Sequence, residues 1–108
     1  MTLRPELALS AVLLSGCNAT LPLPSPAHAE AAQKRSPGTS VESLTAARST
    51  YVAKCSGCHT LWLPERLSAA EWPQAVERMQ TQHGVELTSL EREQVLLYLQ
   101  SVRSDAER

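Results

Sequence analysis

The chain has 108 residues, enough for one small domain, and its formal net charge is −1. This balance argues against a nucleic-acid-binding protein, which would show a basic patch. Hydrophobic residues make up 43% of the chain, but there is no Phe and there are only two Trp and two Tyr. A domain of this size buries proportionally little surface and is marginally stable alone.

Residues 1–16 predict an export signal. Arg4 is the lone positive charge ahead of the apolar run Leu7–Leu14, which is too short to be a permanent membrane span. The segment Leu14–Cys17 (LSGC) follows directly and resembles the lipobox of bacterial lipoproteins. That resemblance implies that Cys17 is acylated and becomes the first residue of the mature chain, so that the protein is held to a membrane by a lipid anchor.

A second cleavage site competes with the first. The sequence Ala27-His28-Ala29 is an ordinary A-x-A signal, and cleavage after Ala29 would release a soluble protein without Cys17. The apolar run ends well before Ala29, which favours processing at Cys17. Both routes export the chain, so we expect a periplasmic protein, either lipid-anchored or soluble.

Residues 17–40 predict a flexible tether because they are rich in Pro, Ser and Ala. With a lipid on Cys17, such a tether would let the following domain move above the membrane. His28 lies in this stretch and is expected to be exposed to solvent.

A first helix is predicted to begin after Thr39 or Ser40, either of which is a suitable N-cap. One apolar stripe then recurs at helical spacing and ends at a cysteine. It consists of Leu44, Ala47, Tyr51 and Cys55.

The segment Cys55–His59 (CSGCH) has the attachment pattern of a c-type haem. Cys55 and Cys58 would each form a thioether bond to a vinyl group of the porphyrin, and His59 would supply one axial nitrogen to the iron. The spacing suits this chemistry because one tight turn must present both sulfurs to one edge of the ring. A covalent haem c, a large flat apolar group, would also complete the small core.

Two other sites use a Cys-x-x-Cys pair. A structural zinc ion needs four ligands, but there is no second Cys pair, and His28 and His83 are far apart in the sequence. A thioredoxin-like dithiol belongs in a βαβ context, and no strand-like alternation is present. Haem is therefore the favoured prediction, and finding covalent haem on the protein would exclude the other two.

After the motif, the apolar residues Leu61–Leu63 are expected to cover the haem edge. A backbone carbonyl near Pro64 would accept the second ring N–H of His59. The sequence Ser68–Glu71 is a capping box, and Pro73 predicts that this first turn is separate from the main helix.

Two more helices are predicted from here. The first presents one face and ends at Gly84, a suitable C′ residue; the face consists of Trp72, Ala75, Val76, Met79 and His83. The capping box Thr88–Glu91 starts the last helix, which carries Leu90 and the run Val95–Leu99 and ends near 101–103. Glu91, Arg92 and Glu93 are expected to form a solvated face, and residues 104–108 to fray.

These features resemble class I cytochromes c. In that family an aromatic residue lies four positions before the first Cys and a small residue four before that, where Tyr51 and Ala47 stand here. The Tyr98-Leu99 pair matches the family's last helix. The resemblance implies an all-α fold of about three helices around one covalent haem, formed by residues 41–103.

Residues 44–103 also resemble the cytochrome subunit of bacterial sulfite dehydrogenases and the haem domain of quinohaemoprotein amine dehydrogenases. The match rests on Trp72, the Arg78-Met79 pair, Gly84 and the final Tyr-Leu helix. It implies that Met79 is the second axial ligand of the iron. Small cytochromes of the dihaem type have a His near the position of His83 instead, offset by one residue. Because His83 is one helical turn from Met79, His83 and an open site remain alternatives.

The expected function is electron transfer and not catalysis, since the iron changes oxidation state and no substrate bond is broken. Trp62 and Trp72 would shield the haem. The expected partners are a periplasmic dehydrogenase and a downstream carrier or oxidase. The alternatives are a haem-bearing subunit of a dehydrogenase complex and a haem sensor or peroxidase-like protein with an open sixth position.

Overall fold

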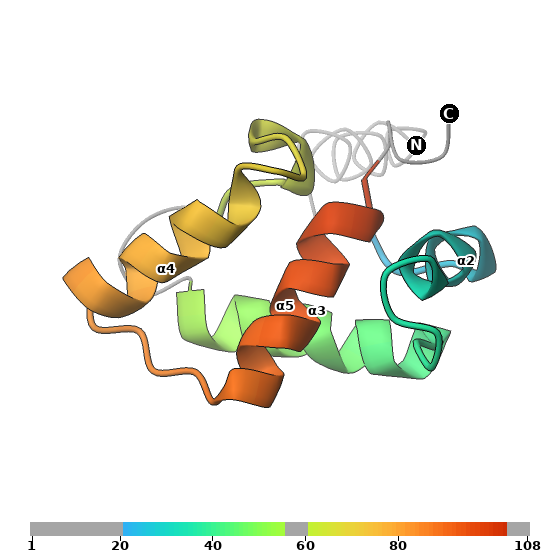
Figure 1. The fold of residues 1–108 in the computed structure, drawn as a ribbon, viewed down its shortest axis with the longest axis horizontal. Helices are drawn as coiled ribbons and strands as arrows, with labels where there is room; N and C mark the ends of the chain where they lie inside the picture. The colour runs from blue at the N-terminus through green and yellow to red at the C-terminus, as the bar shows by residue number, and fades with distance from the viewer. Residues whose placement is uncertain (1–20, 56–60, 104–108) are drawn as a thin grey trace, which may run out of the picture.

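The computed structural model describes residues 21–55 and 61–103, and all regular structure in these two ranges is helical (Figure 1). This confirms the all-α prediction. The described part holds four α-helices, where about three were expected, and one 3-10 turn. The elements are α2 (Pro26–Gln33), α3 (Val41–Cys55), η1 (Pro64–Arg66), α4 (Trp72–Gln82) and α5 (Ser89–Ser101).

Several predicted features fall outside the described residues. They are the export signal at 1–16, the acylation site Cys17, the haem-motif residues Cys58 and His59, and the fraying tail at 104–108.

The centre of the molecule is the packing of α3 against α5, which share the largest interface between helices. The predicted stripe of α3 is confirmed, since its four buried residues are Leu44, Ala47, Tyr51 and Cys55. From α5, Val95, Tyr98 and Leu99 are fully buried. The rings of Tyr51 and Tyr98 lie 6.4 Å apart between centroids, so these two tyrosines meet where α3 packs against α5.

The predicted helix boundaries follow from local hydrogen bonds. The amide of Ser43 donates to Ser40 Oγ at 3.1 Å, which makes Ser40 the cap of α3. The amide of Ser68 donates to Glu71 Oε1 at 2.8 Å, and the amide of Glu71 donates to Ser68 Oγ at 3.2 Å. As expected, this capping box closes a separate turn, and α4 begins only at Trp72.

The capping box at the start of α5 is also confirmed, with reciprocal bonds of 2.9 and 3.0 Å between Thr88 and Glu91. The expected solvated face of this helix is wrong for Arg92. Its Nη1 donates to Gln80 Oε1 at 2.6 Å and lies 3.2 Å from Glu77 Oε1, so Arg92 joins α5 to α4. A long side chain at a helix crossing can reach across it, and the sequence alone does not show that crossing.

Helix α2 corrects the prediction of a flexible tether for residues 21–40. Ser25 caps it through a box with His28: the Ser25 amide donates to His28 Nδ1 at 3.0 Å, and the His28 amide donates to Ser25 Oγ at 3.3 Å. Pro26 occupies the start of the helix, where its fixed φ is favourable and its missing N–H is not needed. His28 is buried, not exposed to solvent as expected, with only 7% of its surface accessible.

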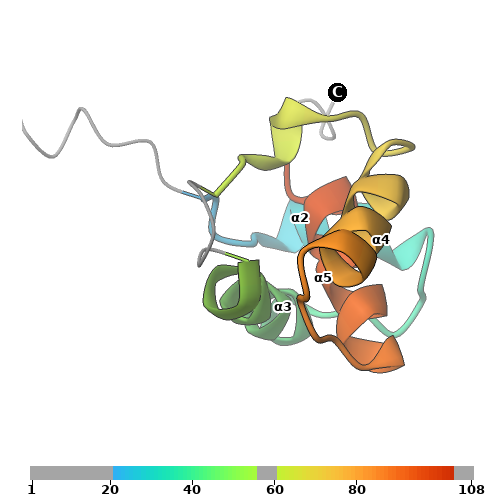
Figure 2. The ribbon, with the colours of Figure 1, turned by 90° about the vertical axis from the view of Figure 1, so that its left-hand side faces the viewer.

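Figures 1 and 2 place α5 between α4 and α2, so the helix before residue 40 covers the opposite side of α5 from α4. Ala32 of α2 is completely buried and Ala29 nearly so. Small side chains allow α2 to approach its neighbours closely, and α2 contacts both α5 and α3. The Pro, Ser and Ala composition therefore marks a short packed helix here, because Pro26 starts the helix instead of breaking it.

Candidate functional site

Cys55, the first residue of the CSGCH motif, is the last residue of α3. Its side chain belongs to the hydrophobic core, and only 7% of its surface is accessible. Burial raises the pKa of the Cys55 thiol because the thiolate is poorly solvated there. In the folded chain this thiol is therefore a weak nucleophile.

The segment that follows the motif, Leu61–Pro64, is held to α3 and α4 by two tertiary hydrogen bonds. Tyr51 Oη donates to the carbonyl oxygen of Trp62 at 2.8 Å. The buried Trp72 Nε1 donates to the carbonyl oxygen of Pro64 at 2.9 Å. Cys55 and the segment from Leu61, which flank residues 56–60 in the sequence, are thus both held by the core.

Trp62 and Trp72, both predicted to shield a haem, have different environments. Trp72 is fully buried and meets Tyr51 edge-on, with ring centroids 6.3 Å apart and an interplanar angle of 86°. Trp62 is half-buried, and the guanidinium of Arg66 lies over its ring at 4.5 Å, a cation–π distance. Trp72 is therefore a core residue between α3 and α4, whereas Trp62 faces a cavity.

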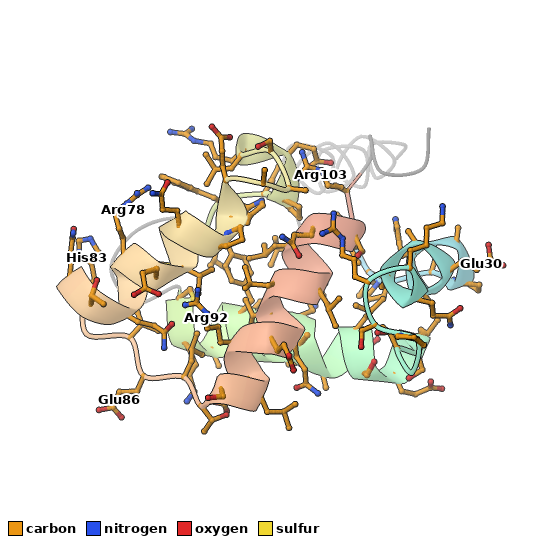
Figure 3. The ribbon with its side chains drawn as sticks, in the orientation of Figure 1. Glu30, Arg78, His83, Glu86, Arg92 and Arg103 are labelled. Carbon is orange, nitrogen blue, oxygen red and sulfur yellow. The ribbon has the colours of Figure 1, made fainter. Side chains whose placement is uncertain are left out.

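That cavity has a volume of about 230 Å³, and its wall contains Met79 and His83, the two candidates for the sixth ligand. Met79 is half-buried and packs on the core, whereas His83 is exposed. Figure 3 shows Arg78 and His83 at the C-terminal end of α4, at the far end of the molecule from Glu30 of α2. The wall consists of Trp62, Ala75, Arg78, Met79 and His83.

A neighbouring cavity of about 470 Å³ also has His83 in its wall, together with Ala53 and Lys54 near the end of α3. The Lys54 ammonium donates to the carbonyl oxygen of Glu86 at 3.0 Å and lies 3.4 Å from Glu91 Oε1. The two cavities thus lie around the C-terminal ends of α3 and α4, which carry Cys55 and Met79.

The chemistry of these walls fits a haem. Trp62, Ala75 and Met79 offer apolar surface for the ring, and Met79 adds a thioether that can ligate iron. Arg78 adds a positive charge of the kind that haem propionates need. In the sequence Arg78 stands out only as part of the Arg78-Met79 pair, and the structure places it in the wall of this cavity.

Within residues 21–55 and 61–103, no three His, Cys, Asp or Glu side chains gather as a metal site of those ligands would need. Cys58 and His59 lie outside these ranges. None of the helices in the same ranges combines the length and the apolar character required to cross a bilayer.

Comparisons of the chain with protein-family models, with curated proteins and with solved structures each found no match. Function is therefore inferred from the CSGCH motif and from the residues arranged around it.

Proposed function

We propose that this chain is a periplasmic c-type cytochrome that carries one covalent haem and transfers electrons. The observation that supports this most strongly is that CSGCH begins at the end of α3, where one cavity is lined by Ala53, Lys54 and His83, and that a second cavity, which shares His83, is lined by Met79. Cys55 and Cys58 would attach the ring, while His59 and Met79 would ligate the iron. When bound, haem supplies a one-electron redox couple.

The residues of the cavity have separate roles in this proposal. The thioether of Met79 is a soft ligand that raises the reduction potential of the iron relative to a second imidazole. Ala75, one turn before Met79, leaves room beside the thioether because its side chain is small. Trp62 limits the access of water to the ring edge, and Arg78 offsets propionate charge.

The burial of Cys55 indicates when attachment takes place. A thiol with a raised pKa inside the core reacts slowly, and a thioether bond also requires access for the ring. Haem attachment would therefore precede the burial of Cys55 in the core.

The test begins with the intact mass of protein matured in a host that attaches haem. We expect one covalent haem in the wild type and none when Cys55 and Cys58 are both replaced by Ala. An unmodified wild-type chain would contradict the proposal and favour a zinc or dithiol site.

The visible spectrum of the oxidised protein then identifies the sixth ligand. We expect a weak far-red iron–sulfur charge-transfer band that Met79→Ala abolishes and His83→Ala leaves intact. A low-spin spectrum without the band, disrupted only by His83→Ala, would show bis-histidine ligation. A high-spin wild type that binds carbon monoxide would replace electron transfer with a sensor or peroxidase-like role.

A further inference from the structure

The chain ahead of α2 is fastened to the two central helices. The carbonyl oxygen of Pro22 accepts a hydrogen bond of 2.7 Å from Tyr98 Oη of α5. The carbonyl oxygen of Leu21 accepts one of 3.3 Å from Arg48 Nη2 of α3. The Leu21 side chain is itself part of the core, with 8% of its surface accessible. The folded domain therefore begins no later than Leu21.

The bond to Tyr98 matters most because this tyrosine is completely buried. A buried hydroxyl that loses its acceptor bears the cost of desolvation without compensation. Without Pro22, the Tyr98 hydroxyl would lose its hydrogen-bond acceptor. Without Leu21, Nη2 of Arg48 would lose its acceptor. Arg48 of α3 and Tyr98 of α5 thus take their hydrogen-bond acceptors from the segment that was predicted to be a tether.

The A-x-A sequence Ala27–Ala29 lies inside α2, not in an extended linker. Cleavage after Ala29 would remove Leu21, Pro22 and the Ser25 cap, and would leave only the last half of α2. Ala32, which is completely buried, would then lie in the remaining four residues of α2, and the first turn of this helix would be missing. A chain processed there would lose most of what holds α2 in place.

We infer that the mature protein keeps residues 21–29, and that a lipid on Cys17 would be joined to the folded domain by three residues only. The lipid itself rests on the lipoprotein signal predicted from the sequence. Residues 18–20 separate Cys17 from Leu21. Four fully extended residue steps reach at most about 14 Å. The domain is therefore held against the membrane surface and does not move on a long tether.

The side chain of Leu23 agrees with this position. It is 68% exposed, the most exposed large apolar side chain in the described part of the chain, and it lies beside the fastened residues Leu21 and Pro22. Exposed leucine next to a lipid anchor can enter the interface of the bilayer. A domain on so short a connection would exchange electrons with redox partners in or on the same membrane.

Amide hydrogen exchange followed by mass spectrometry tests whether the segment is docked, independently of haem and lipid. We expect peptides from 21–33 in the full protein to be protected as strongly as those of α5. Tyr98→Phe should speed exchange in 21–33 about fivefold, because it removes one hydrogen bond. Tyr51→Phe is the matched comparison, because it removes the bond to Trp62 and leaves Pro22 untouched: it should speed exchange in 21–33 only as far as it lowers the stability of the whole protein. Unprotected exchange in 21–33 of the wild type would overturn the inference.

The intact mass of the protein purified from the bacterial envelope tests the mature terminus. A chain that begins at Cys17 with added acyl mass supports both the retained segment and the short connection. An unacylated chain that begins at or before Leu21 supports the retained segment but refutes the lipid anchor. A chain that begins at Glu30 refutes the inference, and covalent haem on that chain would leave the cytochrome proposal standing.

Discussion

Tyr51 and Tyr98 are the two tyrosines of the chain, and each ties an irregular segment to a central helix. Tyr51 donates to Trp62 in the segment that leaves the haem motif, and Tyr98 donates to Pro22 ahead of α2. Their rings also contact each other in the core. Two hydroxyl groups thus connect the candidate site and the N-terminal segment to the same cluster.

Both tyrosines should resist ionisation in the folded protein. Burial raises the pKa of Tyr98 to about 12 from its ordinary value of 10.0, and it raises the pKa of Tyr51 above its usual range as well. The unfolded chain therefore loses these protons first as the pH increases. Stability should be complete below about pH 10 and should fall as the pH rises toward the folded pKa values. Tyrosinate absorbance during an alkaline titration measures this directly.

The control for that titration is the protein in denaturant, where both tyrosines should ionise near their ordinary pKa. Tyr98→Phe and Tyr51→Phe each remove one ionising hydroxyl, so the transition that is lost in a variant belongs to the tyrosine that was replaced. A tyrosine that titrates near its ordinary pKa in the folded wild type would contradict the buried environment described above.

At the scale of elements, the end of α4 positions the residues of the candidate site. Gly84 follows the last turn with φ +71°, and the amide of Val85 donates to the carbonyl oxygen of Met79 at 3.1 Å. This is the αL termination expected from the sequence. It ends α4 directly after His83 and lets the chain turn toward α5.

Gly84→Ala should destabilise the protein by about 1 kcal/mol, because an L side chain is strained at positive φ. The added Cβ would have no atom within 4 Å, so the cost comes from the backbone alone. Gly38→Ala is the matched control, because its Cβ is equally unobstructed and its φ is not in the left-handed region. Denaturant midpoints of the two variants measure the difference, and equal midpoints would show that the αL conformation is not present.

For the whole molecule, the important feature is that α2 belongs to the same core as α3, α4 and α5. Buried residues of all four helices, together with Leu21, form one hydrophobic cluster. Because Tyr98 contacts both Pro22 and Tyr51, the N-terminal segment and the candidate site both pack on the same pair of tyrosines. We expect them to unfold together.

Ala32→Gln tests whether α2 belongs to the cooperative core of the whole protein. Ala32 is completely buried, so a longer polar side chain should cost about 1–3 kcal/mol of overall stability. Ala27→Gln, at an exposed position of the same helix, should change stability by less than about 0.5 kcal/mol. If both variants unfold at the wild-type midpoint, α2 does not contribute to the cooperative core.

The predictions that succeeded depend on short-range physics. The apolar stripe from Leu44 to Cys55 follows from helical periodicity, the capping boxes at Ser68 and Thr88 from hydrogen bonds three residues apart, and the turn at Gly84 from its missing side chain. The CSGCH motif is also a local pattern, and haem attachment there stays a prediction. All of these signals are complete within one or two helical turns.

The features that local patterns did not predict depend on partners far away in the sequence. Residues 21–33 are rich in Pro and Ala, a composition that suggests a tether, yet they pack on the core, where Tyr98, 76 residues after Pro22, donates a hydrogen bond to its carbonyl oxygen. Arg92 was expected to be solvated, yet it joins α5 to Gln80 and Glu77 of α4. Local sequence patterns predicted where α3, α4 and α5 begin and end. The tertiary structure decided which segments join the core, because burial and long-range hydrogen bonds form only after the helices have packed.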